Sequence, residues 1–331
     1  FLSGGIDSSL LLAAMSAQTD QPVISYCAAF DDDSVPNEHS LAFDVAKECH
    51  AEYRGITVTF DDFDQSLPQI CAAFDEPVAD YAAIGLWHLA CAAKADGIKV
   101  VLSGEGGDEI FGGYGRYRTN WWRDFMAKIL PARDHLSKAG LGKTSTAFPL
   151  PLWQNTGLHA DMPPTTRMQH LQSLDCQAWL PDNLLIKLDR MLMQHGVEGR
   201  TPFLDPMILP FYGLPDEWKQ HKRLGKWILR DILSETLPQA QPFSKKRGFS
   251  VPVGAWIARI GVQLAPIISR DPALAPFIDQ AKTEAFFMSP HAIQRHSMAA
   301  WRLVFCALWH RIHVMEVDAR GHNITSLLAM K

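Results

Sequence analysis

Apolar, strand-like segments alternate with helical stretches over the first 114 residues, and this alternation constrains the fold more than any other feature. Parallel strands need a long crossover connection, so such an alternation is typical of a parallel sheet with helices on its faces. The sequence therefore predicts an α/β region that closes near Tyr114. The predicted strands are the strand end at residues 1–2 and the segments 22–30, 55–60 and 98–102; the predicted helices are 6–17, 38–52 and 81–95.

The residues beyond 114 have a different character, because β-branched runs become rare and apolar residues fall at helical spacing. They predict a mainly helical region over 137–331, after an α/β region over 1–136. The segment 137–166 is rich in Pro, Gly, Ser and Thr, and we expect a long connection or a lid there. Helices are predicted after Pro181, with Gly196 as terminator, and over 225–237 and 292–314.

The composition is that of a globular protein with ample material for a core, since 47% of the 331 residues are hydrophobic. The chain has 31 Lys and Arg against 36 Asp and Glu, so it has no global positive field to attract nucleic acid or an anionic membrane. It also lacks an uncharged apolar stretch of ~18 residues and a signal-peptide pattern at its start. We therefore expect a cytoplasmic protein in which local groups hold any anionic substrate.

Six cysteines occur without any CxxC pair, and most of them lie in apolar runs. This pattern predicts buried free thiols in a reducing compartment rather than disulfides or zinc ligands. The six are Cys27, Cys49, Cys71, Cys91, Cys176 and Cys306.

A glycine loop, SGGIDSS at residues 3–9, lies between a predicted strand end and a predicted helix start. Free N–H groups and the positive end of the helix dipole bind anions at such a place, and glycines let a phosphate approach the backbone. Asp7 would repel phosphates unless Mg²⁺ lies between them. The alternative is a tight turn with Asp and Ser as helix caps. The loop matches neither the GK[ST] phosphate loop nor the GxGxxG dinucleotide fingerprint.

A second glycine loop, SGEGGDE at residues 103–109, follows the predicted strand 98–102. Open α/β sheets bind ligands at the carboxyl ends of their strands, so both glycine loops should face one pocket. Three carboxylates in one loop repel each other unless a cation or proton intervenes. A loop that binds a metal ion and supplies a general base therefore explains the segment better than the alternative, a solvated acidic turn.

Five ordered blocks resemble one enzyme family. SGGIDS resembles the pyrophosphate loop of the ATP pyrophosphatases, and LSGEGGDEIFGGY at 102–114 resembles a signature of the asparagine synthetase family's carboxyl-terminal synthetase domain. The blocks 184–206, 225–230 and 245–250 agree in order and spacing. The resemblance implies a Rossmann-like parallel sheet flanked by helices, followed by a helical region that selects the acceptor.

The resemblance also implies roles for individual residues. It places Asp7 and Asp108 on Mg²⁺ and pyrophosphate, Glu105 as the base that handles ammonia, and Lys246 as the cation that stabilises adenylation. Arg200 and Asp205 would bind the acceptor and order its loop, or form a buried structural pair. The remaining predicted ATP and pyrophosphate contacts are Leu2, Ser3, Gly4, Gly5, Ser8, Ser9, Ala28, Ser103, Gly104 and Lys226.

The implied activity is ATP-dependent amide formation through an acyl-adenylate, with aspartate converted to asparagine and AMP and pyrophosphate released. Two alternatives stay open: amidation of another carboxylic acid, such as a sugar acid or a peptide, and a nucleotide-binding module without catalysis. The family carries an amino-terminal glutaminase with a cysteine as first residue, whereas this chain starts at Phe1. We expect a piece of a longer protein, or an enzyme that takes ammonia from solution or from a glutaminase partner.

Overall fold

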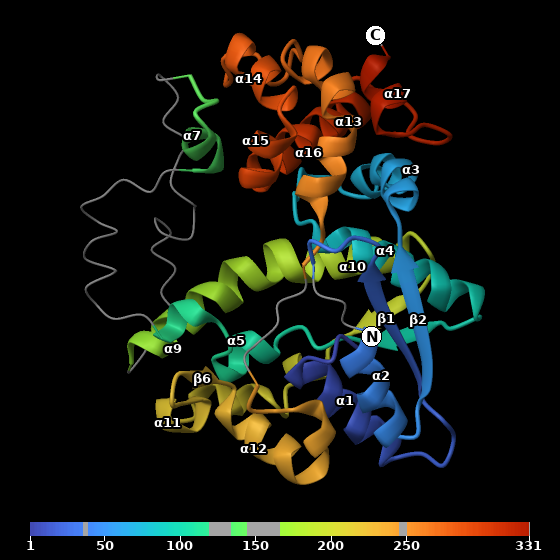
Figure 1. The fold of residues 1–331 in the computed structure, drawn as a ribbon. Helices are drawn as coiled ribbons and strands as arrows, with labels where there is room; N and C mark the ends of the chain where they lie inside the picture. The colour runs from blue at the N-terminus through green and yellow to red at the C-terminus, as the bar shows by residue number, and fades with distance from the viewer. Residues whose placement is uncertain (36–38, 119–133, 144–165, 245–249, 331) are drawn as a thin grey trace.

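The structure is a computed structural model that describes residues 1–35, 39–118, 134–143, 166–244 and 250–330. It is a mixed α/β structure in which helices predominate over small sheets. Figure 1 shows strands β1 (Ile24–Phe30) and β2 (Glu52–Val58) running between two groups of helices. The carboxyl-terminal helices form the upper group, and the lower group contains the helices that follow the glycine loops, the helix at 39–48 and the helices between residues 216 and 236.

Parallel pairing of strands is confirmed, in two small sheets. Strand β1 pairs with β2 from Ile24 opposite Glu52 to Phe30 opposite Val58. Strand β3 (Val100–Leu102) pairs in parallel with β4 (Glu198–Arg200), which the sequence did not predict. A third pair, β5 (Gln220–His221) and β6 (Leu224–Gly225), is antiparallel.

The first two residues connect the two parallel pairs. The nitrogen of Leu2 donates to the carbonyl of Tyr26 in β1 at 2.7 Å, and that of Phe1 donates to the carbonyl of Leu102 in β3 at 2.8 Å. Residues 1–2 therefore lie between β1 and β3. The first glycine loop, which follows them, consequently starts at the level where β3 ends.

The predicted helices at 6–17 and 81–95 are confirmed as α1 (Ile6–Ser16) and α4 (Ala82–Ala95). Within the predicted helix 38–52, α2 ends at Glu48 and β2 begins at Glu52, while residues 36–38 lie outside the described part. The predicted strand 55–60 ends at Val58. The reason is a capping box between Thr59 and Asp62, which starts an unpredicted helix at Phe60.

The expected helix start after Pro181 is wrong. A continuous helix already begins at Arg167, and Pro181 lies inside a π-helical section whose wider turns accommodate the proline ring. The predicted helix 292–314 is two helices, because His296 has a non-helical backbone (φ −120°, ψ 43°) between them. Of the predicted connection 137–166, residues 144–165 lie outside the described part, and residues 137–139 end a short helix.

The largest hydrophobic core joins the α/β part to the carboxyl-terminal helices. Trp256 and Trp301 are fully buried there, together with Phe63 and Phe74 from the helix that follows β2 and the turn after it. This core fixes the upper helices of Figure 1 against α4. Within the described residues, no helix has the length and apolar character needed to cross a bilayer.

The remaining helices have the following bounds. They are α2 (His39–Glu48), α3 (Phe60–Ala72), α5 (Gly107–Phe111), α7 (His135–Ala139), α9 (Arg167–Leu174), the π-helix η2 (Asp175–Leu185), α10 (Ile186–Met193), α11 (Asp216–Lys219), α12 (Trp227–Thr236), α13 (Val253–Ile268), α14 (Gln280–Phe287), α15 (Pro290–Arg295), α16 (Ser297–His313) and α17 (Ile324–Ala329). Short 3-10 turns are η1 (Gly115–Arg118), η3 (Pro202–Leu204), η4 (Leu209–Gly213) and η5 (Pro238–Ala240).

Candidate active site

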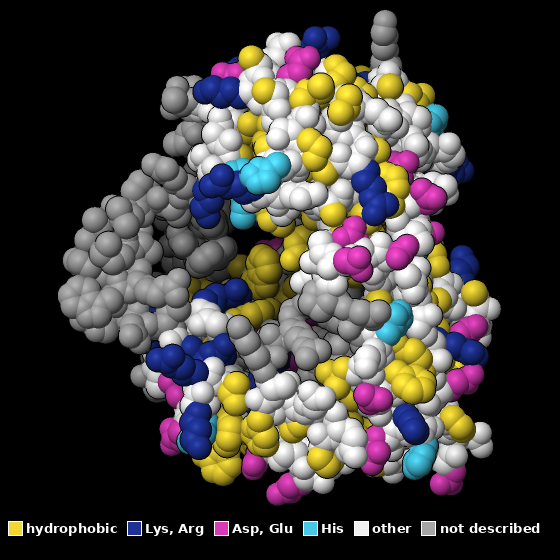
Figure 2. Space-filling model, in the orientation of Figure 1, with side chains coloured by type: hydrophobic (Ala, Val, Ile, Leu, Met, Phe, Trp, Pro, Cys, Tyr) yellow, Lys and Arg dark blue, Asp and Glu magenta, His cyan; other side chains and the backbone are white. Residues whose placement is uncertain are grey.

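Both glycine loops open into one large cavity of about 990 Å³. Its walls also include residues of α4, η2, α10, α12 and α16, so segments from the whole length of the chain meet there. On the face shown in Figure 2 the surface is hollowed between the upper helices and the part below them, with hydrophobic and basic side chains inside the hollow. The volume is in the range of sites that hold a nucleotide-sized ligand.

The first glycine loop is held by its own serines and opens α1. The hydroxyls of Ser3 and Ser8 lie 3.2 Å apart, and the nitrogen of Gly5 donates to Ser3 Oγ at 3.3 Å. Gly4 has a positive φ of 67° and packs against Leu41, which favours glycine there. Gly5 is the N-cap of α1 and supplies no side-chain cap, so the helix N-terminus faces the cavity as an anion site.

Glycines of the second loop allow it to touch the first. A Cβ added to Gly104 would lie 2.9 Å from the Cβ of Asp7, and one added to Gly107 would overlap the Asp7 carboxylate. A Cβ on Gly113, just after α5, would overlap the Asp108 carboxylate. The glycines thus form a cradle around the two aspartates.

Asp7 and Asp108 converge on one cation. Lys226 Nζ forms ion pairs with Asp7 Oδ2 and with Asp108 Oδ1, the latter at 2.9 Å, and the Lys226 side chain is 5% exposed. Burial opposes the charge of Lys226, but the two carboxylates outweigh it and hold the pKa of Lys226 above its usual value. Lys226 is therefore a charged ammonium buried between two carboxylates.

This donor set fits Mg²⁺ bound with a nucleotide. Proteins hold Mg²⁺ through one or two carboxylates, with phosphate oxygens and waters completing the shell. Asp7 and Asp108 supply two carboxylates that already approach a single positive charge, next to the helix N-terminus that suits phosphate. The glycines at 107 and 113 leave room in which the Asp7 carboxylate, the Asp108 carboxylate and the end of the Lys226 side chain meet.

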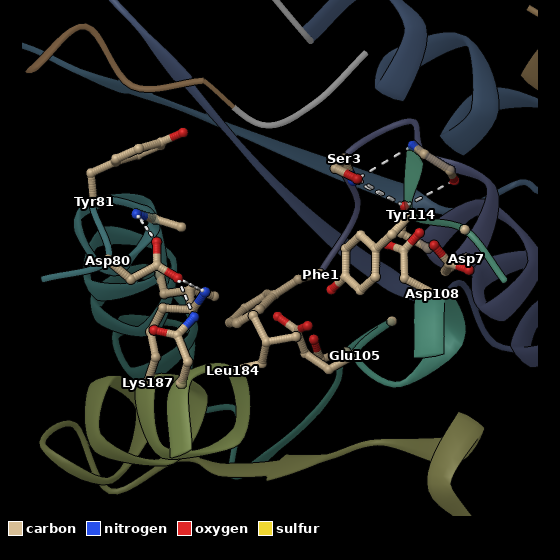
Figure 3. A pocket seen from close by; sticks show the side chains of 18 of the residues that line it. Phe1, Ser3, Asp7, Asp80, Tyr81, Glu105, Asp108, Tyr114, Leu184 and Lys187 are labelled. Atoms are coloured by element: carbon tan, nitrogen blue, oxygen red, sulfur yellow. Dashed lines mark hydrogen bonds and ion pairs between the residues drawn. The ribbon is translucent and has the colours of Figure 1, made fainter. Parts of the chain in front are cut away.

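Glu105 lines the same cavity, in the second glycine loop. Burial raises the pKa of Glu105 to about 7. The Lys187 ammonium lowers this pKa, whereas nearby carboxylates raise it further. A carboxylate with this pKa changes its protonation state near neutral pH, which suits a general base. Figure 3 shows Glu105 next to Asp108, on the side of the glycine loops, and Asp80 and Lys187 on the far wall of the cavity.

That far wall holds a buried ion pair that the sequence reading missed. Lys187 Nζ in α10 donates to Asp80 Oδ2 at 2.7 Å, and Asn183 Nδ2 donates to the same oxygen at 3.1 Å. The Lys187 side chain is 4% exposed. Lys187 lies within the block 184–206, one of those that resemble the family. Its position as a charged residue on the apolar face of a predicted helix could have indicated a buried functional charge.

Arg230 is a second missed residue. It is buried on α12, donates through Nε to the carbonyl of Gly225 at 2.7 Å, and binds the carbonyls of Pro242 and Ser244. It thereby fastens the segment that leads to Lys246. Lys246 itself lies at 245–249, outside the described residues.

Most of the predicted site residues surround the cavity, and three do not. Ser9 is buried behind the first loop, with 0% exposure. Arg200 is exposed and lies 3.9 Å from Glu198, while Asp205 is exposed and accepts from the nitrogen of Met207, so these two do not form a buried pair. The predicted residues that line the cavity are Leu2, Ser3, Gly4, Gly5, Asp7, Ser8, Ala28, Ser103, Gly104, Glu105, Asp108 and Lys226.

The chain is similar to known proteins of one family. Residues 1–311 match the family model described as asparagine synthase. The chain belongs to the asparagine synthase family. A putative glutamine-hydrolysing asparagine synthetase of Mycobacterium tuberculosis is 29% identical over 367 residues, covering 95% of this chain and 54% of the relative. Asparagine synthetase 1 of Bacillus subtilis is 26% identical over 364 residues, covering 95% and 56%.

The match to the asparagine synthase family extends to an archaeal protein over a shorter range. A putative asparagine synthetase 2 of Methanocaldococcus jannaschii is 32% identical over 132 residues, covering 39% of this chain and 25% of the relative. The chain spans about half the length of the first two relatives, 54% and 56%. The names of these family members are those of carbon–nitrogen ligases that form an amide.

Proposed function

We propose that this member of the asparagine synthase family amidates a carboxylic acid at the expense of ATP, through an acyl-adenylate, releasing AMP and pyrophosphate. One observation carries the proposal: the carboxylates of Asp7 and Asp108 meet at a helix N-terminus, in a cavity that also contains Glu105 with a pKa of about 7. A nucleotide-binding module without catalysis would have no use for a buried carboxylate of that kind. Its presence favours an enzyme.

The chemistry has two steps. An oxygen of the acceptor carboxylate attacks the α-phosphorus of ATP, a P–O bond to pyrophosphate breaks, and a mixed anhydride with AMP forms. Ammonia then attacks the acyl carbon, AMP leaves with the former carboxylate oxygen, and the nitrogen loses a proton, for which Glu105 is the acceptor.

The chain's own groups prepare these steps. The free N–H groups at the start of α1 and the hydroxyls of Ser3 and Ser8 bind phosphate oxygens. Leu2 and Ala28 line the part of the cavity that receives the nucleoside. Asp7 and Asp108 would hold Mg²⁺, which supplies charge neutralisation for the triphosphate when bound. Lys226 pairs with both aspartates and holds them in place, and Lys246 is proposed to stabilise charge on the attacked phosphate.

Several finer points belong to the same proposal. Aspartate is the first acceptor to test, because the relatives are named asparagine synthetases, and a glutaminase domain or subunit would supply the ammonia. The two parallel strand pairs with residues 1–2 between them favour one Rossmann-like sheet built mainly from region 1–136, to which the acceptor region at 137–331 adds β4. The six cysteines, all of which lie among the described residues, form no disulfide, which favours a cytoplasmic location.

An exchange experiment tests the adenylation step. The protein is incubated with ATP, Mg²⁺, a carboxylic acid and labelled pyrophosphate, and the label is expected in ATP only when an accepted acid is present. Lys246→Ala should slow this exchange by about 10²–10³-fold, because it removes charge stabilisation during attack on the α-phosphorus. Absence of exchange with every acid tested, under conditions where ATP binds, contradicts the proposed reaction.

We expect these 331 residues to release no glutamate from glutamine. A glutaminase nucleophile needs an electropositive, partly exposed thiolate, whereas burial raises the pKa of Cys176 to about 12 and raises that of Cys49, Cys71, Cys91 and Cys306. The measurement is glutamate release by this chain alone, with ammonium-dependent turnover as the control for folded enzyme. Clear glutamate release would show that one of these thiols, or another group of the chain, acts as a nucleophile.

A further inference from the structure

A buried lysine outside the cavity, Lys219 at the end of α11, is bound to uncharged groups. It is 0% exposed, and its Nζ donates to Gln172 Oε1 at 3.1 Å and to the backbone carbonyl of Tyr212. Burial lowers the pKa of Lys219 to about 8, although the charge of Asp216 raises it. A buried ammonium is costly when its hydrogen-bond partners are neutral. A lysine at this place therefore indicates a role that an apolar side chain would not fill.

Gln172 on α9 connects this lysine to α5. Gln172 is 0% exposed, and its Nε2 donates to the carbonyls of Glu109 at 2.5 Å and Ile110 at 3.0 Å. These carbonyls belong to the last turn of α5, where the helix itself offers no partner. An ammonium can only donate, so Lys219 binds the amide oxygen of Gln172 and leaves the NH₂ group for the two carbonyls.

Helix α5 is too short to keep its position without such contacts. It has five residues, and its N-cap, Gly106, provides no side-chain cap. Figure 1 shows α5, α9 and α11 next to one another in the lower left of the view, and the hydrogen bonds of Gln172 join them. Gln172 and Lys219 thus fasten the end of a helix that carries Asp108 in its first turn.

Asp108 has little freedom to move. A Cβ on Gly113 would overlap its carboxylate, and its Oδ1 lies 2.9 Å from Lys226 Nζ. Mg²⁺ requires ligand oxygens at about 2.0–2.1 Å in near-octahedral geometry. A small shift of α5 would therefore weaken the binding of Mg²⁺ with a nucleotide.

We propose that Lys219 and Gln172 are positioning residues for the Mg²⁺–ATP site. Lys219 orients the Gln172 amide, and Gln172 holds α5 so that the Asp108 carboxylate is placed to hold Mg²⁺. Neither residue lines the cavity. The inference rests on the proposed role of Asp108 and extends it to two residues from other helices.

Equilibrium binding of Mg²⁺–ATP and of adenosine provides the first test. Lys219→Met and Gln172→Leu should each raise the Kd for Mg²⁺–ATP about 3- to 10-fold, the range for one lost hydrogen bond. The Kd for adenosine, which has no phosphate to share a metal, should stay within about twofold and shows that the variant is folded. An unchanged Kd for Mg²⁺–ATP, or an equal rise for both ligands, overturns the inference. If the unmodified protein binds Mg²⁺–ATP no more tightly than adenosine, the proposed metal site itself fails.

Gln172→Glu distinguishes positioning from packing and serves if the two apolar substitutions prevent folding. Glutamate keeps the size of the side chain and can pair with Lys219, but its carboxylate cannot donate to the carbonyls of α5. We expect the Kd for Mg²⁺–ATP to rise at least as much as in Gln172→Leu. Normal Mg²⁺–ATP affinity in Gln172→Glu contradicts the proposed role.

The double variant tests whether Lys219 acts through Gln172. Lys219→Met combined with Gln172→Leu should raise the Kd for Mg²⁺–ATP by the same 3- to 10-fold, roughly, as either substitution alone, because the two residues act in series. Independent effects would multiply to about 10- to 100-fold and overturn this part of the inference. In pyrophosphate exchange, the KM for Mg²⁺–ATP should rise while the KM for the acid stays unchanged.

A buried cation among the upper helices supplies a matched control. Arg311 on α16 is 9% exposed, lies 3.8 Å from Asp271 and donates to the backbone carbonyl of Met330. Arg311→Met should lower the stability of the protein but leave the Kd for both ligands unchanged. A rise in the Kd for Mg²⁺–ATP in this variant would attribute the effect to lost stability instead of to the position of α5.

Discussion

Glu105→Gln is expected to lower ammonia-dependent amide formation by about 10²–10⁴-fold, the usual contribution of a positioned general base. Glutamine preserves the size of the side chain but cannot take the proton that ammonia loses. Pyrophosphate exchange should fall far less, because adenylation requires no proton transfer to Glu105. The measurement compares amide formation and exchange in the same preparation.

The pH dependence gives an independent check on the same residue. Burial raises the pKa of Glu105 to about 7, so the carboxylate is ionised above that pH and protonated below it. Amide formation, corrected for the concentration of free ammonia, should therefore fall as the pH drops through about 7. This dependence should be absent from the residual rate of Glu105→Gln.

A matched control is Glu52→Gln, because Glu52 is an exposed carboxylate on β2 whose side chain is 47% accessible. It should leave both half-reactions unchanged. Retention of normal ammonia-dependent turnover in Glu105→Gln would remove Glu105 from the role of base.

Lys226→Met is expected to destabilise the protein by about 3–5 kcal/mol, as when one partner of a buried ion pair is removed. The substitution leaves the Asp7 and Asp108 carboxylates close together without the ammonium that now lies between them. Pyrophosphate exchange should fall as well, because the carboxylates lose the positions described above. Urea denaturation at neutral pH measures the change in the free energy of unfolding.

A matched control shows whether the losses of stability and of pyrophosphate exchange depend on the buried position of Lys226. Lys94→Met, at an exposed lysine on α4, should show neither effect. A loss of similar size in both variants would show that the Lys226 charge has no special role.

Much of the local structure followed from sequence pattern. Helices α1 and α4 are where the spacing of apolar residues placed them, and β1 lies within the predicted segment 22–30. The two glycine loops lie beside each other, as expected from strands that end at a common edge. The errors in the prediction were local too. The Thr59–Asp62 capping box starts a helix that the spacing of apolar residues did not reveal. His296 divides the predicted helix 292–314 into two helices.

The sequence by itself determined the alternation of elements, the two anion-binding loops and the family, because helical periodicity, glycine positions and motif order are all properties of neighbouring residues. Only the tertiary structure decided which distant charges meet. Lys226 reaches Asp7 across 219 positions of the chain, and Lys187 reaches Asp80 across 107. Strand β4 joins β3 from outside the predicted α/β region. Such pairs depend on how helices and strands pack against one another. A local sequence pattern determines on which face of a helix or strand a residue lies, but not which distant residue contacts it.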